Sequence, residues 1–211
     1  MIKPEILRAA EAHLRRRDKR LAKLIDAHGP STLGAKRRDP FHVLCGSIIG
    51  QQLSSKAADT IQARIAVALG AGATFAPAHF LATEHEYLRG CGLSNAKARW
   101  LKALAEAAHG GTLSFKALRK LDDEAAIELL DALPGIGRWT AEMFLIFALD
   151  RIDIFSLGDV GLRNALDRIH NGGEKLDTET TLAITARWAP YRSVGSWYLW
   201  RLTDGDIATW T

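Results

Sequence analysis

The chain reverses direction at Leu133-Pro134-Gly135-Ile136-Gly137-Arg138-Trp139-Thr140-Ala141, a Pro/Gly-rich turn between two segments of helical apolar spacing, 122–130 and 139–148. Pro134 prevents the first helix from continuing, and Gly135 and Gly137 allow a tight reversal with an uncovered backbone. The N–H groups and the dipole at the start of the second helix attract anions, and Arg138 adds a positive charge beside them. The stretch therefore predicts a helical hairpin over 122–148 that holds a phosphate group.

The turn has two other interpretations. Gly-x-Gly is common in plain helix-to-helix turns, so a turn that binds nothing is one alternative. A nucleotide-binding P-loop is disfavoured, because no strand pattern precedes the turn and no Gly-Lys-Ser/Thr follows it.

The rest of the chain is also predicted to be helical. Apolar residues recur every three or four positions without strand-like alternation, so we expect an all-α fold. Ser94 is placed to cap a helix that runs to residue 108. The basic run 15–20 is interpreted as the solvated face of one amphipathic N-terminal helix. The spacing is clearest at Leu7, Ala10, Leu14, Leu21, Leu24, Ile25, Ile61, Ile65, Ala68, Trp100, Leu101, Leu104 and Ala108.

Composition fits a globular protein with a substantial core, since 47% of the 211 residues are hydrophobic. The net charge of +4 and the pI near 9.2 fit a partner that carries phosphates, although an ordinary solvated surface explains them equally well. Cys45 and Cys91 lack the spacing of a disulfide framework or a zinc site.

The N-terminus has no apolar signal-peptide core, and the longest apolar run, 143–149, is too short for a membrane span. We expect no membrane partner and a cytoplasmic location, nucleoid-associated if the source is bacterial.

An isolated carboxylate, Asp159, follows Trp139 by twenty positions and opens the next helical pattern. Taken alone, Asp159 is a good helix N-cap. A carboxylate can also stabilise a developing positive charge or orient an attacking water. Gly158 is expected to let the chain turn so that this carboxylate points into a cleft.

The hairpin string with Asp159 at its spacing resembles the helix-hairpin-helix, Gly/Pro-rich loop and Asp signature of the DNA glycosylase superfamily. The segments Ile48-Ile49-Gly50-Gln51-Gln52-Leu53-Ser54 and Arg187-Trp188-Ala189-Pro190-Tyr191-Arg192-Ser193, with Trp200, resemble its alkylpurine branch, the 3-methyladenine DNA glycosylase II type. The resemblance covers about residues 41–200. The N-terminal β-rich domain of that family has no counterpart in this sequence, so the resemblance is to a compact form. It implies one domain, 1–211, with two helical lobes, about 1–35 with 150–211 and 41–148, flanking an active-site cleft.

The resemblance implies an enzyme of base excision repair that hydrolyses the N-glycosidic bond of alkylated purines in damaged double-stranded DNA, with Asp159 catalytic. Relatives that also cut the backbone carry a lysine where this chain has Trp139, so no lyase activity is expected. The alternatives are a glycosylase for another lesion, such as hypoxanthine or ethenoadenine, and a noncatalytic DNA-binding module.

The same resemblance assigns the remaining site residues. The flipped base is expected to stack on Trp139 and Trp200, and Met143 and Val160 stand where relatives carry pocket tyrosines, which implies a wider or less aromatic pocket. Gln52 is expected to fill the gap left by the base, with Leu53 as the alternative. The other expected DNA contacts are Gln51, Gly135, Gly137, Arg138 and Thr140.

No cofactor is expected to be required, and the two cysteines cannot supply a four-cysteine iron–sulfur cluster. The resemblance implies a structural Na⁺ or K⁺ held by the backbone carbonyls of Asp131, Leu133 and Ile136. The histidines lack metal-ligand spacing, so a catalytic metal is not expected. A monomer is the expected form.

Overall fold

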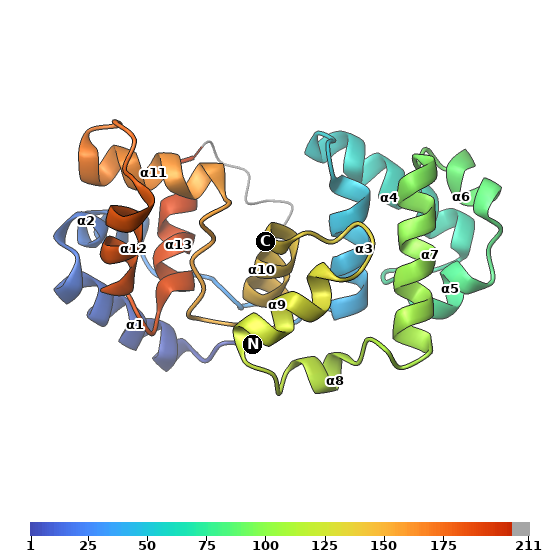
Figure 1. Ribbon diagram of the computed structural model, residues 1–211, viewed down its shortest axis with the longest axis horizontal. Helices are drawn as coiled ribbons and strands as arrows, with labels where there is room; N and C mark the ends of the chain where they lie inside the picture. Colours follow the sequence, from blue (N-terminus) through green and yellow to red (C-terminus); the bar gives the residue numbers. More distant parts are fainter. Residues whose placement is uncertain (204–211) are drawn as a thin grey trace. The chain divides into compact units, whose positions relative to one another are not determined.

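The structure, a computed structural model, describes residues 1–203. Within this range every regular element is a helix, which confirms the all-α prediction (Figure 1). Residues 204–211, the end of the expected lobe 150–211, lie outside the described residues. The helices are α1 (Pro4–Arg17), α2 (Lys19–His28), α3 (Pro40–Gly50), α4 (Ser55–Leu69), α5 (Pro77–Leu81), α6 (His85–Gly90), α7 (Asn95–His109), α8 (Phe115–Leu118), α9 (Asp123–Asp131), α10 (Arg138–Ala148), α11 (Val160–Asn171), α12 (Thr178–Ala186) and α13 (Arg192–Trp200).

The chain forms two compact units. Among the described residues, unit 1 consists of 1–37 and 145–203, and unit 2 consists of Arg38–Phe144. In unit 1, α13 packs against α1, α2 and α11. In unit 2, α3 packs against α4 and α7, and α7 also packs against α5 and α6 (Figure 1). The boundary at 144/145 falls within α10, so this helix contributes residues to both units.

The predicted single N-terminal helix is wrong, because the chain breaks at Asp18 into α1 and α2. Asp18 has an extended backbone, and its carboxylate accepts hydrogen bonds from the N–H groups of Arg20 and Leu21. Aspartate favours this capping conformation over the helix interior. The buried carboxylate also accepts the indole N–H of Trp188 at 2.9 Å, which explains why the break occurs inside an unbroken apolar periodicity.

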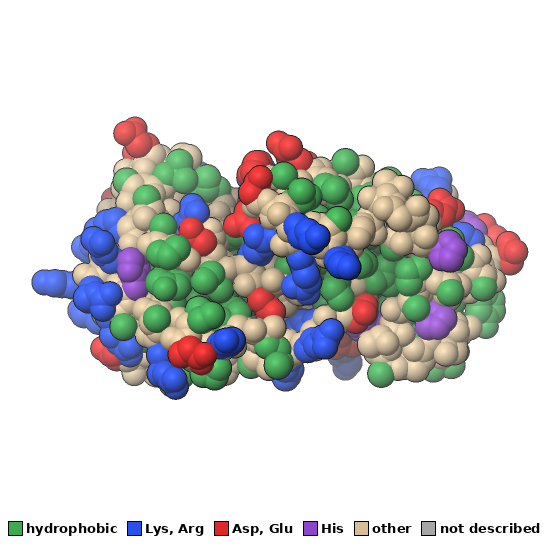
Figure 2. Space-filling model, turned by 90° about the horizontal axis from the view of Figure 1, so that it is seen from below, with side chains coloured by type: hydrophobic (Ala, Val, Ile, Leu, Met, Phe, Trp, Pro, Cys, Tyr) green, Lys and Arg blue, Asp and Glu red, His purple; other side chains and the backbone are tan. Residues whose placement is uncertain are grey.

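The basic residues of α1 and α2 face solvent, as the sequence predicts. Residues 1–28 hold eight Lys or Arg and four Asp or Glu, a balance equal to the +4 of the whole chain. Two of those four carboxylates, Glu11 and Asp18, are buried. Figure 2 shows the Lys and Arg side chains gathered over the part of unit 1 that α1 and α2 form. The positive balance of the chain therefore belongs to these two helices.

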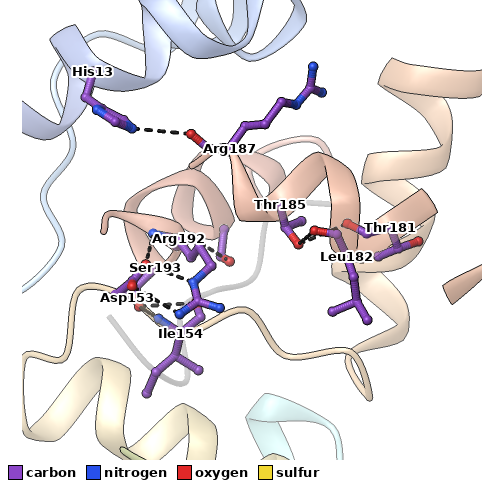
Figure 3. A network of polar contacts seen from close by, with 10 residues as sticks. His13, Asp153, Ile154, Thr181, Leu182, Thr185, Arg187, Arg192 and Ser193 are labelled. Carbon is purple, nitrogen blue, oxygen red and sulfur yellow. Dashed lines mark hydrogen bonds and ion pairs between the residues drawn. The ribbon is translucent and has the colours of Figure 1, made fainter. Parts of the chain in front are cut away.

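The start of α13 is fixed by polar contacts from the segment that follows α10 (Figure 3). Asp153 accepts hydrogen bonds from the Arg192 backbone N–H and guanidinium, the latter at 2.8 and 3.0 Å. Ser193 Oγ accepts the N–H of Ile154 at 2.9 Å. Paired guanidinium–carboxylate contacts of this kind are directional as well as strong. They orient α13, at whose far end Trp200 lies.

Candidate functional site

The turn between α9 and α10 is built around Gly135. Its φ of +83° lies in the left-handed region, where a side chain is strained. A Cβ at this position would also lie 2.5 Å from Cδ2 of Trp100, which α7 places beneath the turn. Only glycine satisfies both conditions, so this residue is required by the fold of unit 2 itself.

Gly137 differs from Gly135, because nothing within unit 2 requires it to be glycine. A Cβ there would meet no atom within 4 Å, and its φ is not positive. Its carbonyl accepts the N–H of Ala141 at 3.0 Å, which makes Gly137 the residue before the first turn of α10. The first N–H groups of a helix point along its axis away from the helix body. The uncovered approach at Gly137 gives an anion access to this end of α10.

Arg138 has its charge matched by two carboxylates. Its guanidinium donates to both oxygens of Glu124 at 2.6 and 2.8 Å and to Glu142 at 3.1 Å. The hydrogen bonds to Glu124 hold the pKa of Arg138 above its usual range and lower the pKa of Glu124. This arrangement ties the first turn of α9 to the first turn of α10. Sequence reasoning missed Glu124 and Glu142 because it considered Arg138 only beside its neighbours in the turn.

The loop between α3 and α4 carries two exposed side chains, Gln52 and Leu53, and Leu53 is 39% exposed. Gln52 has a φ of +59°, a left-handed conformation that costs a residue with a side chain on the order of 1 kcal/mol. Such outliers persist where their surroundings hold them. The neighbouring Gln51 is half-buried and donates its side-chain N–H to the Gly135 carbonyl at 2.7 Å. Gln51 therefore connects this loop to the hairpin.

Sequence reasoning missed Lys97. Its ammonium donates to the carbonyl of Ile49 at 2.8 Å and to the carbonyl of Gln51 at 2.5 Å, and burial lowers its pKa. One sequence signal was available, since Lys97 lies in the first turn of α7, where the helix dipole disfavours a cation. A lysine there needs acceptors outside its own helix, and the end of α3 provides them.

Asp159, in unit 1, is the helix N-cap that the local sequence pattern predicts. It caps α11, with Oδ1 accepting the N–H of Leu162 at 2.8 Å. Its other oxygen, Oδ2, accepts the indole N–H of Trp200 at 3.3 Å. The whole residue is 8% exposed. Capping therefore uses one carboxylate oxygen, while the other faces an aromatic side chain.

Gly158 lies in a turn, as expected, which the Asp159 N–H closes by donating to Ser156 O at 3.2 Å, but this turn does not require glycine. The φ of Gly158 is not positive, and a Cβ there would meet nothing within 4 Å. The close approach is at Gly161, where a Cβ would lie 3.2 Å from Oδ1 of Asp159 and 3.5 Å from Thr203. Glycine at 161 therefore leaves room for the carboxylate, and the sequence could not show this because the crowding depends on the conformation of Asp159.

The aromatic candidates lie in different surroundings. Trp200 is 7% exposed, and its ring lies 5.3 Å from that of Phe147, tilted by 37°. Trp139, at the start of α10 in unit 2, is 41% exposed. Val160 is exposed in unit 1, whereas Met143 and Thr140 are buried on α10. Met143 thus lies within the packed part of its helix.

The three carbonyl positions expected to hold a monovalent cation lie where α9 ends, at Asp131, and in the turn that follows. Leu133 O accepts the N–H of Ile136 at 3.1 Å and keeps a second lone pair. Carbonyls at a helix C-terminus carry partial negative charge, so the donor set fits a hard monovalent ion. In the part of the chain that the structure describes, no group of three or more His, Cys, Asp or Glu could hold a metal ion. None of the described helices is long and apolar enough to cross a membrane.

A family model described as "HhH-GPD superfamily base excision DNA repair protein" matches residues 45–190. The chain is 35% identical over 199 residues to DNA-3-methyladenine glycosylase 1 of Schizosaccharomyces pombe, covering 92% of this chain and 87% of that protein. It is 31% identical to the alkylbase DNA glycosidase-like protein mag2 of the same yeast, covering 96% of each chain.

Solved structures are also similar. A DNA-3-methyladenine glycosidase from Bacillus halodurans aligns with a TM-score of 0.83 and 35% identity, over 94% of this chain and 88% of that chain. The S. pombe 3-methyladenine DNA glycosylase Mag1, in complex with abasic DNA, aligns with a TM-score of 0.76 and 33% identity, over 96% and 99% of the two chains.

Proposed function

This chain belongs to the HhH-GPD superfamily of base excision DNA repair proteins, and from that membership we propose that it is a monofunctional DNA glycosylase that releases alkylated purines from double-stranded DNA. The observation that carries the proposal is the state of Asp159, a carboxylate that is nearly buried, is held by the first turn of α11, and lies against the indole of Trp200. Relatives with names such as DNA-3-methyladenine glycosylase support the alkylated purine as substrate.

In the proposed reaction the glycosidic bond breaks and the sugar acquires oxocarbenium character. Asp159 stabilises this positive charge and orients the attacking water. A purine alkylated at N3 or N7 is cationic and already a good leaving group, so a single carboxylate is sufficient without a paired acid. Stacking and cation–π interactions, each about 0.5–2 kcal/mol, attract such a base to an aromatic face, and Trp200, whose indole lies against Asp159, offers one.

DNA is held, in this proposal, by the hairpin and the α3–α4 loop of unit 2. The N–H groups at the start of α10 bind a backbone phosphate, for which the open approach at Gly137 leaves room. A cation on the carbonyls of Asp131, Leu133 and Ile136 would add positive charge next to that phosphate. Gln52, exposed and held in a left-handed conformation, fills the space left by the extruded base, with Leu53 beside it.

Lyase activity is not part of the proposal. A backbone-cutting mechanism needs an amine that forms a Schiff base with the sugar. Position 139 carries an indole, whose nitrogen is not nucleophilic. The expected product is therefore an intact strand with an abasic site.

The test uses duplex oligonucleotides that contain 3-methyladenine, 7-methylguanine, hypoxanthine or ethenoadenine, with chromatography of the released base. Release of the methylated purines, with strand breaks only after alkali, supports the proposal. Release of hypoxanthine or ethenoadenine alone identifies a different lesion class. Salt-sensitive duplex binding without release of any base identifies a noncatalytic module. Spontaneous nicking with borohydride-trappable protein refutes the absence of lyase activity, and gel filtration tests the proposed monomer.

A further inference from the structure

The first two turns of α7 support both segments of unit 2 that the proposed function assigns to DNA. Lys97 and Trp100 lie three residues apart, so they project from adjacent positions on the same side of the helix. Lys97 holds the end of α3 through Ile49 O and Gln51 O. Trp100 lies directly beneath Gly135 of the hairpin.

The two supported segments are also connected to each other. The Gln51 carbonyl accepts a hydrogen bond from the Lys97 ammonium, while the Gln51 side-chain N–H donates to Gly135 O. Gln51 is therefore joined to α7 by one end and to the hairpin by the other. Because Gln52 follows directly in a left-handed conformation, the position of its side chain depends on where these contacts hold residue 51.

The Lys97 contacts suit the end of a helix. The last carbonyls of α3 have no partner within their own helix, and Ile49 O is one of them. A cation at this end also interacts favourably with the helix dipole. The loop turn that follows is closed by the Leu53 N–H donating to Gly50 O at 3.1 Å. The Lys97 ammonium therefore binds the carbonyls of Ile49 and Gln51, on either side of Gly50, where this turn starts.

We propose that Lys97 is a positioning residue that fixes the Gln52–Leu53 loop at a defined place relative to the phosphate-binding hairpin. Gln52 can then enter the space left by the extruded base while the hairpin holds the backbone phosphate. The inference rests on the proposed function for what the loop does with DNA. The rigidity of the loop itself is a property of the free protein. The two parts can therefore be tested separately.

Lys97→Met removes the ammonium and keeps an unbranched apolar stem, while Lys97→Arg keeps a cation. The matched control is Lys102→Met on the same helix, because the Lys102 ammonium donates to Thr83 O at 2.6 Å and so binds the end of a different loop. Both methionine variants lose a lysine-to-carbonyl contact from α7. Only the Lys97 variant loses it beside the loop.

The first measurement is amide hydrogen exchange in the DNA-free protein. We expect exchange at residues 50–54 to accelerate at least tenfold in Lys97→Met and to remain within twofold of wild type in Lys102→Met. Equal exchange at these residues in the two variants would overturn the proposal, and so would unchanged exchange in Lys97→Met. If Lys97→Met does not fold, Lys97→Gln takes its place and is judged by the same criteria.

The second measurement is the ratio of affinities for abasic-site and undamaged duplexes, by fluorescence anisotropy. Lys97→Met should reduce this ratio about tenfold with undamaged binding within twofold of wild type, and Lys97→Arg should restore most of it. Loss of affinity for both duplexes in equal proportion would show a general structural role and overturn the proposal. If the wild type shows neither selectivity nor base release, the proposed function fails, whereas the exchange result still decides whether Lys97 positions the loop.

Discussion

Replacing Asp159 by asparagine separates the two roles of this side chain. Asparagine keeps an oxygen that can accept the N–H of Leu162, now at 2.8 Å, and it caps helices about as well as aspartate. The variant therefore loses the charge while α11 keeps its first hydrogen bond. Alanine, in contrast, loses both.

The size of the effect follows from the environment of the carboxylate. A unit charge about 4 Å from the developing sugar cation contributes about 4 kcal/mol at an effective dielectric constant of about 20, which suits a group that is 8% exposed. That free energy corresponds to about 10³-fold in rate. Loss of the cap in Asp159→Ala costs about 1 kcal/mol of stability, or about 2–4 °C in the thermal midpoint of a chain of this size.

The assay is single-turnover release of 7-methylguanine from a methylated duplex, with the thermal midpoint measured on the same preparations. We expect Asp159→Asn to release base about 10³-fold more slowly with a midpoint close to that of wild type. Asp159→Ala should be as slow and measurably less stable. Release by Asp159→Asn within tenfold of wild type would refute the electrostatic role of the carboxylate.

Three further predictions concern other contacts. Trp200→Phe removes the 3.3 Å N–H contact to the Asp159 carboxylate but keeps an aromatic ring, so single-turnover release should fall about tenfold. Unchanged release would show that this contact does not orient the carboxylate. Gly135→Ala should lower the free energy of unfolding by about 1–3 kcal/mol, since its Cβ would lie 2.5 Å from the Trp100 indole. Gly137→Ala should leave stability unchanged and weaken duplex binding. The opposite pattern in thermal and anisotropy measurements would contradict the assignment of the two glycines. Burial alone would raise the pKa of Asp18, but contact with His170, whose Nε2 lies 3.0 Å from Oδ2, and the hydrogen bonds from Leu21 and Trp188 hold that pKa below the usual 3.8. The ionised group therefore stabilises the fold above about pH 4, and this stabilisation is lost as the pH falls further. Asp18→Asn should flatten acid unfolding curves, and an identical decline in both proteins would refute this.

The sequence predicted those features that depend on neighbouring residues. The helices expected at 122–130 and 139–148 lie within one residue of α9 and α10, because proline, glycine and apolar periodicity act locally. The capping position of Asp159 is likewise a local pattern. Asp18 shows the limit, since its capping preference is local but the Trp188 contact that accompanies the break comes from 170 positions away.

Contacts between distant segments explain what the sequence did not show. Lys97 donates to carbonyls 46 and 48 positions earlier in the chain. Because every residue has a main-chain carbonyl, residue type does not reveal such partners. The two hairpin glycines are equivalent in the motif, yet Gly135 is required by the Trp100 ring and Gly137 is not. A motif records that glycine is present, and only packing shows whether the fold or a ligand needs it.

The charge of the chain leads to a similar distinction. A pI near 9.2 would ordinarily be assigned to the surface that meets phosphate. In this protein the positive balance lies on residues 1–28, whereas the one arginine at the hairpin is bound by two carboxylates. The phosphate binding proposed for the start of α10 would then depend on main-chain N–H groups and the helix dipole, together with the proposed cation, and no count of lysines and arginines measures these contributions. The basic composition and the hairpin motif are consequently separate features, and agreement between them in the sequence is not evidence that one causes the other.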